Sequence, residues 1–102
     1  MAHRVVWLPA AADDLEAIAS YISSNSPSYA AGMVRKVLTA AEMLAEFPRM
    51  GRQVPEWDDE IIRERIIYPY RMIYRVETKQ VVVLAVIHGA RLLPDQLRDR
   101  DW

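Results

Sequence analysis

Residues Tyr70–His88 read YRMIYRVETKQVVVLAVIH, two β-prone runs separated by the polar turn Thr78-Lys79. Branched and aromatic residues are frequent in both runs, and so short a turn predicts that they pair as a hairpin. The run Val81–Ile87 is apolar at every position, which predicts a strand that is covered on both faces. These residues therefore predict a small antiparallel sheet.

Further β-prone runs lie on the N-terminal side of this hairpin. One is Ile61–Ile67, joined to the hairpin by a turn that contains Pro69, and the other is His3–Leu8 at the start of the chain. The segment Arg49–Asp59 contains glycine and proline and is expected to be a connecting loop. The sequence thus predicts four strands, one of them far from the others along the chain.

Two helices are predicted between the first strand and the loop. Apolar residues recur at helical spacing over about Ala10–Ser23 and again over about Pro27–Glu46. Ser26 before Pro27 is typical of an N-cap followed by proline at the first helical position. Because the break between the helices is so short, we expect an antiparallel helical hairpin.

The predicted order is β-α-α-β-β-β, an α+β fold with a helical hairpin packed on a small antiparallel sheet. The chain of 102 residues has the length of one domain, so residues 1–102 are expected to form a single unit. One sheet face would be buried under the helices, and the other is expected to stay at least partly open.

The composition excludes several classes of function. Cysteine is absent, which excludes disulfides and thiol nucleophiles, and His3 and His88 are too far apart to suggest a metal site. We expect no cofactor and no small-molecule substrate. No apolar run approaches the roughly 18 residues of a membrane span, and no signal peptide is evident, so a cytoplasmic protein is expected. The net charge of −1 argues against a general attraction to nucleic acid.

Four segments together resemble the toxins of the RelE/ParE superfamily of bacterial type II toxin–antitoxin systems. They are Trp7 with Ala11–Ile22, Leu44–Gly51, Tyr70–Val76 and Val83–Arg91. Each segment consists mostly of core residues, but their order along the chain is fairly specific. The resemblance covers roughly Trp7–Leu97. It implies a growth inhibitor, connected with plasmid stabilisation, that a co-expressed antitoxin neutralises.

The superfamily has two branches with different targets. RelE-like members are ribosome-dependent endoribonucleases that cut mRNA, and the resemblance would then assign Arg71, Arg91 and His88 to the catalytic site. ParE-like members act on DNA gyrase and have no known catalytic site of their own. RNA cleavage requires an acid, a base and cations for the phosphate, and a histidine suits either proton-transfer role.

The sequence departs from the RelE-like pattern. Arg91 is followed by Leu92-Leu93-Pro94-Asp95, without the tyrosine that RelE-like toxins place there, and the chain contains only two lysines. A net charge of −1 also fits poorly with docking on ribosomal RNA. We therefore favour the ParE-like branch and keep the RelE-like nuclease as an alternative. A non-toxic binding module, such as a decayed toxin, is the second alternative.

Two sets of residues are candidates for binding. Large apolar side chains that a two-helix layer cannot fully cover could form a groove for an antitoxin helix or strand: Trp7, Tyr21, Met33 and Tyr70, with Met50 and Tyr68 as further candidates. Arginines on the predicted strands and after them could bind the target: Arg63, Arg65, Arg71, Arg75 and Arg91.

Each of these residues also has an ordinary structural interpretation. Alternation places Arg63 and Arg65 on one face of their strand and Arg71 and Arg75 on one face of theirs, which is also the pattern of a solvated sheet face. Arg71 could pair with Glu64 or Glu77. His88 ends an apolar strand, where a histidine is more often hydrogen-bonded than catalytic.

Overall fold

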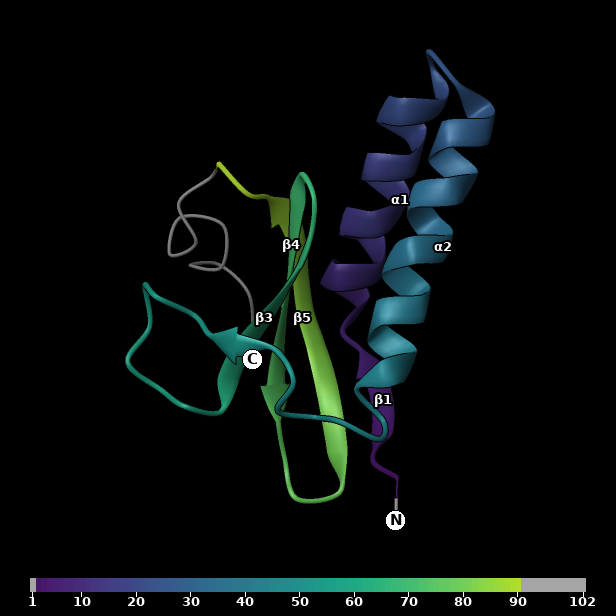
Figure 1. The fold of residues 1–102 in the computed structure, drawn as a ribbon. Coiled ribbons are helices and arrows are strands. Elements are labelled where there is room, and N and C mark those ends of the chain that lie inside the picture. Colours follow the sequence, from purple (N-terminus) through teal and green to yellow (C-terminus); the bar gives the residue numbers. More distant parts are fainter. Residues whose placement is uncertain (1, 91–102) are drawn as a thin grey trace.

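The computed structural model describes residues 2–90 as two helices packed on one sheet (Figure 1). The elements, in chain order, are β1 (Arg4–Trp7), α1 (Pro9–Ser23), α2 (Pro27–Met43), β2 (Arg52–Gln53), β3 (Ile62–Ile67), β4 (Tyr70–Val76) and β5 (Gln80–His88). This order confirms the predicted α+β fold. The predicted tail, with Arg91, lies outside the described residues.

The sheet has five strands in the order β1-β5-β4-β3-β2 and is mixed, not wholly antiparallel. β1 pairs with β5 in parallel, whereas the other pairs are antiparallel. The helical hairpin brings the chain back beside its start, and β3, β4 and β5 then alternate in direction, so β5 runs the same way as β1 (Figure 1). The fifth strand, β2, lies in the predicted loop and is too short to leave a pattern in the sequence.

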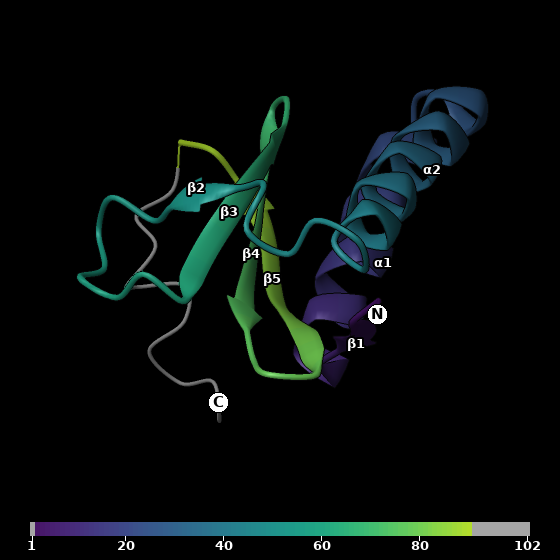
Figure 2. The same cartoon turned by 60° about the horizontal axis from the view of Figure 1, so that its bottom comes forward.

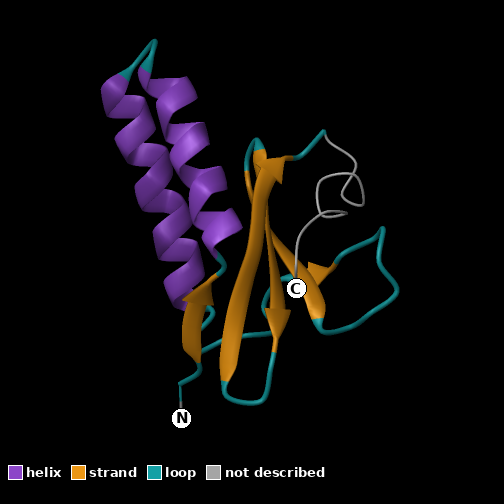
Figure 3. Ribbon diagram, turned by 180° about the vertical axis from the view of Figure 1, so that it is seen from behind, coloured by secondary structure: helices purple, strands orange, loops and turns teal. Residues whose placement is uncertain are grey.

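The two helices form the antiparallel layer that the sequence predicts (Figure 3). The Ser26 hydroxyl accepts a hydrogen bond from the Tyr29 amide at 3.2 Å, which confirms the N-cap. α2 ends at Met43, before the predicted end at Glu46. Beyond it the amides of Leu44, Ala45 and Glu46 bond to carbonyls three residues back, so the last turn tightens.

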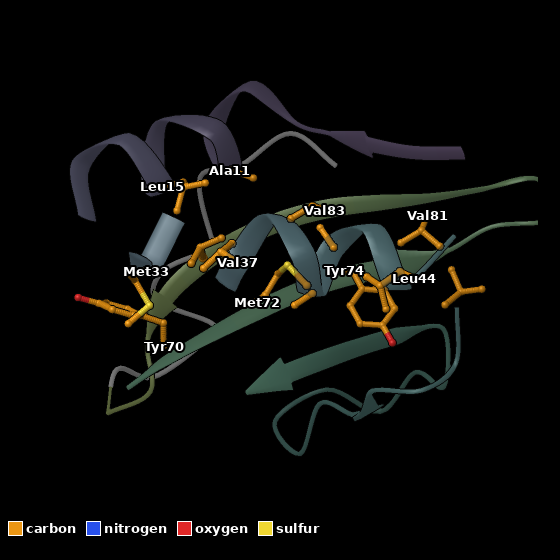
Figure 4. Packing of buried hydrophobic residues seen from close by; sticks show 14 residues of the cluster. Ala11, Leu15, Met33, Val37, Leu44, Tyr70, Met72, Tyr74, Val81 and Val83 are labelled. Atoms are coloured by element: carbon orange, nitrogen blue, oxygen red, sulfur yellow. The ribbon is translucent and has the colours of Figure 1, made fainter. Parts of the chain in front are cut away.

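The main core lies between the helices and the sheet (Figure 4). Its fully buried side chains include Val37 and Leu44 from the helical side and Met72 and Tyr74 from the sheet. The amide of Gly51 donates to the Tyr74 hydroxyl at 3.0 Å, and burial raises the pKa of the Tyr74 phenol above its ordinary value. The start of the segment after α2 is thereby fastened to the core.

The second face of the sheet is covered in part, in keeping with the expectation that it stays at least partly open. A second cluster gathers there: Val54, Ile62, Ile73, Val82, Leu84, Ala85 and Ile87. Trp57 and Ile61, from the segment between β2 and β3, pack against it. That segment extends away from the helices (Figure 2). Since β5 contributes to both clusters, its predicted burial on both faces is confirmed.

The pairing of β4 with β5 contains a β-bulge. Ile73 lies opposite Ala85 and Tyr74 lies opposite Val83, so the register passes over Leu84. Both Leu84 and Ala85 belong to the second cluster. A bulge of this kind shifts the alternation of side chains by one residue. Residues of β5 on both sides of the bulge therefore alternate between the main core and the second cluster.

Asp14 caps the part of β5 that β1 does not reach. The pairing of β1 ends at Val83, and beyond it the Asp14 carboxylate accepts a hydrogen bond from the Val86 amide at 2.9 Å. Without that acceptor, a partly buried donor on an uncovered strand edge would be left unsatisfied.

We expect Asp14→Ala to lower the free energy of unfolding by about 1–2 kcal/mol, because the Val86 amide loses its acceptor. Chemical denaturation measures this loss, and amide hydrogen exchange should become faster at Val86. Asp13→Ala is the control, since Asp13 is the exposed neighbour on the same helix. Equal effects of the two substitutions would contradict the capping role.

Candidate functional site

Arg71 lies in a buried network of charges between β3, β4 and the segment after β2. Its Nε donates to Glu64 at 2.7 Å, and Nη1 and Nη2 each donate to Glu56 at 2.8 Å. Arg52 bonds to the other oxygen of Glu64. The Glu64 side chain is 0% exposed, so its charge depends on these two arginines. Glu64 is thus a partner of Arg71, as one of the sequence alternatives had it.

The network fixes the charge and the direction of the Arg71 guanidinium. The hydrogen bond with Glu56, opposed by burial and supported by Glu64, raises the pKa of Arg71 above its ordinary value. Because its Nε and both terminal nitrogens already donate to carboxylates, an incoming phosphate would have to displace one of them.

Glu56 had no predicted role. No sequence pattern distinguishes Glu56 in the irregular segment before β3. The only signal in the sequence is Glu64 on a β-prone run, because a carboxylate buried there would need a cation beside it.

His88 ends β5 and is held by its neighbours. Its Nδ1 accepts a hydrogen bond from the Ala90 amide at 3.2 Å, and its ring lies edge-on to Tyr70 with centroids 5.9 Å apart. An acceptor at Nδ1 places the proton of the neutral ring on Nε2. This is the hydrogen-bonded strand-end histidine that the sequence left as one interpretation.

Arg71 and His88 line the same cavity of about 600 Å³, together with Tyr68 and Tyr70. The structure therefore brings together two of the three residues that a nuclease would use, and Arg91 lies outside the described part of the chain. Both arginines that line this cavity are already bonded to carboxylates, Arg52 to Glu64 and Arg71 to Glu56 and Glu64.

The arginines predicted to bind a target do not form one surface. Arg63 and Arg65 lie opposite Tyr74 and Met72 and share their face with the main core. Arg71 and Arg75 lie opposite Ile66 and Ile62 on the other face. Each predicted pair is correct, but the pairs are on opposite sides of the sheet. Arg75 is bonded to Glu77 at 2.9 Å. Hydrogen bonds from the side chain of Gln80 first, and from that of Arg75 next, lower the pKa of Glu77.

The apolar side chains predicted to form an antitoxin groove differ in how far they are exposed. Met33 and Tyr70 are core residues with 3% and 8% exposure. Trp7 is partly buried against the same core. Tyr21 is 76% exposed and shares a cavity with Tyr70, Asp14 and His88. An antitoxin groove at these residues stays a prediction, with Tyr21 and Tyr70 lining one cavity and Trp7 lining another.

Within residues 2–90, no three histidine or acidic side chains gather in a way that could hold a metal ion. In the same part of the chain, no helix is long and apolar enough to cross a bilayer.

Comparison with known proteins identifies the family. Residues 5–93 match the family described as ParE toxin of type II toxin–antitoxin system, parDE. Toxin RelE2 of Caulobacter vibrioides is 37% identical over 89 residues, covering 87% of this chain and 98% of that protein. The putative toxin Y4kP of Sinorhizobium fredii is 30% identical over 96 residues, covering 92% of this chain and 96% of its own length.

Two solved structures share the fold. The chromosomal ParDE system of P. aeruginosa gives a TM-score of 0.69 at 22% identity, covering 84% of this chain and 95% of that one. The RelBE2 toxin–antitoxin complex of Mycobacterium tuberculosis gives a TM-score of 0.62 at 22% identity, covering 86% of this chain and 99% of that one. The chain therefore belongs to the ParE toxin family and is a type II toxin of the RelE/ParE superfamily.

Proposed function

We propose that this protein inhibits DNA gyrase by binding to it, without catalysis of its own, and that a cognate antitoxin neutralises it. The observation that carries the proposal is the state of Arg71, whose nitrogens donate to Glu56 and Glu64. A nuclease needs a cation free to stabilise phosphate charge. Inhibition by contact needs only a stable surface. The proposal places the protein in the cytoplasm, where gyrase acts.

A ribosome-dependent mRNA endoribonuclease is the second candidate. One observation favours it: Arg71 and His88 line one cavity together with two tyrosines. A relative named RelE2 is also among the similar proteins. Cleavage would require Arg71 to exchange a carboxylate for the substrate phosphate and His88 to transfer a proton through Nε2.

We expect His88→Asn to change gyrase inhibition by less than about 2-fold, because the proposal gives this side chain no proton to transfer. The alternative expects cleavage to fall by about 100-fold or more. The measurements are a supercoiling assay with purified gyrase and primer extension on mRNA in a translating extract.

The wild-type chain and a His3→Asn variant are the controls, since His3 is remote in sequence from the cavity. Undiminished supercoiling at an excess of folded wild-type protein would overturn the proposal. Codon-linked cuts that disappear in His88→Asn would establish the nuclease instead. Absence of both activities, with unimpaired growth on induction, would indicate a non-toxic binding module.

A further inference from the structure

Among residues 2–90, five cations on or near α2 and β3 form no ion pair with a carboxylate of that part of the chain. They are Arg35, Lys36, Arg49, Arg63 and Arg65. The ion pairs among residues 2–90 instead use Arg52, Arg71 and Arg75. The net charge of −1 therefore conceals an uneven distribution, with unneutralised positive charge along α2 and β3.

Three of these cations line one groove between α2 and β3. The groove has a volume of about 490 Å³, and Arg35, Lys36 and Arg65 contribute its charges. Its other lining residues are Gly32, Thr39, Ala40, Met43, Ile66 and Ile67. No carboxylate lies among them. Met43 is 42% exposed, so the groove offers apolar surface beside its positive charge. Ile66, 53% exposed, borders the groove at the strand edge, with its side chain on the face of the sheet that carries Arg71.

Two buried nitrogen atoms on β3 lack an acceptor. The Nε atoms of Arg63 and Arg65 are both buried and make no hydrogen bond within the described structure. Buried donors in folded proteins are nearly always satisfied. Arg63 is anchored by its Nη1, which donates to the Gly51 carbonyl at 2.8 Å. Arg65 thus lines the groove with an Nε donor that no acceptor in residues 2–90 uses.

The outer edge of β3 is partly unpaired. β2 pairs with β3 only at Arg63 and Glu64. The Ile62 carbonyl accepts from the Val54 amide and so faces this edge. Peptide groups two and four residues further along a strand face the same way. The amide and carbonyl of Ile66 therefore face an edge at which residues 2–90 supply no strand.

We propose that the groove between α2 and β3 binds an acidic and partly apolar segment of the antitoxin, running in an extended conformation beside Ile66. This inference rests on the proposed function in taking the antitoxin as the partner. Carboxylates would satisfy Arg35, Lys36 and Arg65, and the segment's backbone would extend the sheet. Its apolar side chains would cover Met43 and Ile66. A nucleic-acid backbone would supply the charge but leave this apolar surface uncovered.

The test compares two double substitutions that change the net charge equally. Arg35→Glu/Lys36→Glu alters exposed residues of the groove, and Arg4→Glu/Lys79→Glu alters exposed residues elsewhere. The first probe is a labelled synthetic peptide of alternating glutamate and leucine or valine, measured by fluorescence anisotropy. A peptide with lysine in place of glutamate and a 20-base-pair DNA duplex are the comparison probes.

The groove variant is expected to weaken binding of the glutamate peptide by about 30- to 100-fold, against less than about 3-fold for the control variant. Binding should also weaken as salt rises. Equal loss in both variants, or no loss in either, would overturn the proposal. So would DNA binding that is stronger than peptide binding and is lost in the groove variant, since the surface would then recognise nucleic acid.

Co-expression with the antitoxin separates this inference from the proposed function. In a gyrase assay without antitoxin, the groove variant should inhibit as the wild type does, but the antitoxin should no longer neutralise it. If wild-type protein fails to inhibit gyrase, the proposed function is wrong, and the pull-down of antitoxin by each variant still tests the groove. Unchanged capture of antitoxin by the groove variant would refute the assignment.

Discussion

Alanine in place of Arg71 is expected to lower the free energy of unfolding by about 3–5 kcal/mol, a large part of the stability of a small domain. The substitution leaves the Glu64 carboxylate, with no exposed surface on its side chain, facing Arg52 alone. It also removes the bonds from Arg71 to Glu56, which help to hold the segment that carries Trp57 against the second cluster. Urea denaturation followed by circular dichroism measures the effect.

Arg75→Ala is the matched control on the same strand. The side chain of its partner Glu77 is 34% exposed. An ion pair this accessible to solvent is expected to contribute about 0–1 kcal/mol to the free energy of unfolding. A double substitution, Arg71→Met with Glu64→Leu, should recover much of the loss, because it removes the unpaired buried charge as well as its partner. A loss from Arg71→Ala no greater than that from Arg75→Ala would show that the network is not a structural centre.

Gly51→Ala should destabilise the fold by about 2–4 kcal/mol, because the added methyl group has no space. It would overlap the Glu64 carbonyl oxygen and lie 2.6 Å from the Tyr74 hydroxyl. Relief requires a backbone shift that breaks the bond from the Gly51 amide to Tyr74. Thermal unfolding and the near-ultraviolet circular dichroism of the tyrosines report the change.

Gly32→Ala is the corresponding control in an open position. Gly32 lies within α2, and nothing lies within 4 Å of a methyl group added there. Alanine is a better helix former than glycine, so this substitution should stabilise the protein by about 0.5–1 kcal/mol. The two glycine variants thus have opposite expected signs, and a shared sign would contradict the packing explanation.

The regular elements were predictable because their signals are local. The spacing of Leu15, Ile18 and Ile22 indicates a helix whatever lies around it, and Ser26-Pro27 marks the start of the next. Pairing between strands that are distant in the sequence was harder to predict. The parallel direction of β1 depends on the path of the whole chain, and the two-residue strand β2 has no period to detect.

The candidate site was predictable only as a set of alternatives. Arg71 could be assigned to a phosphate or to a carboxylate from the sequence, and the decisive partner, Glu56, comes from a segment without regular structure. The basic groove was not predicted at all. Arg35 and Lys36 lie on a helix, and Arg65 lies on a strand much later in the chain, so only tertiary packing makes them neighbours.

The uniformly apolar strand β5 has a consequence for the unfolded chain. In the native sheet it lies between β1 and β4: it pairs with β4 over Val81–His88 and with β1 over Gln80–Val83, and beyond Val83 Asp14 caps the amide of Val86. Released from those neighbours, Val81–Ile87 combines high β-propensity with the absence of charge and proline, the composition of segments that stack into amyloid-like aggregates. Strongly destabilised variants should therefore accumulate in inclusion bodies, so that solubility in the cell reports directly on folding.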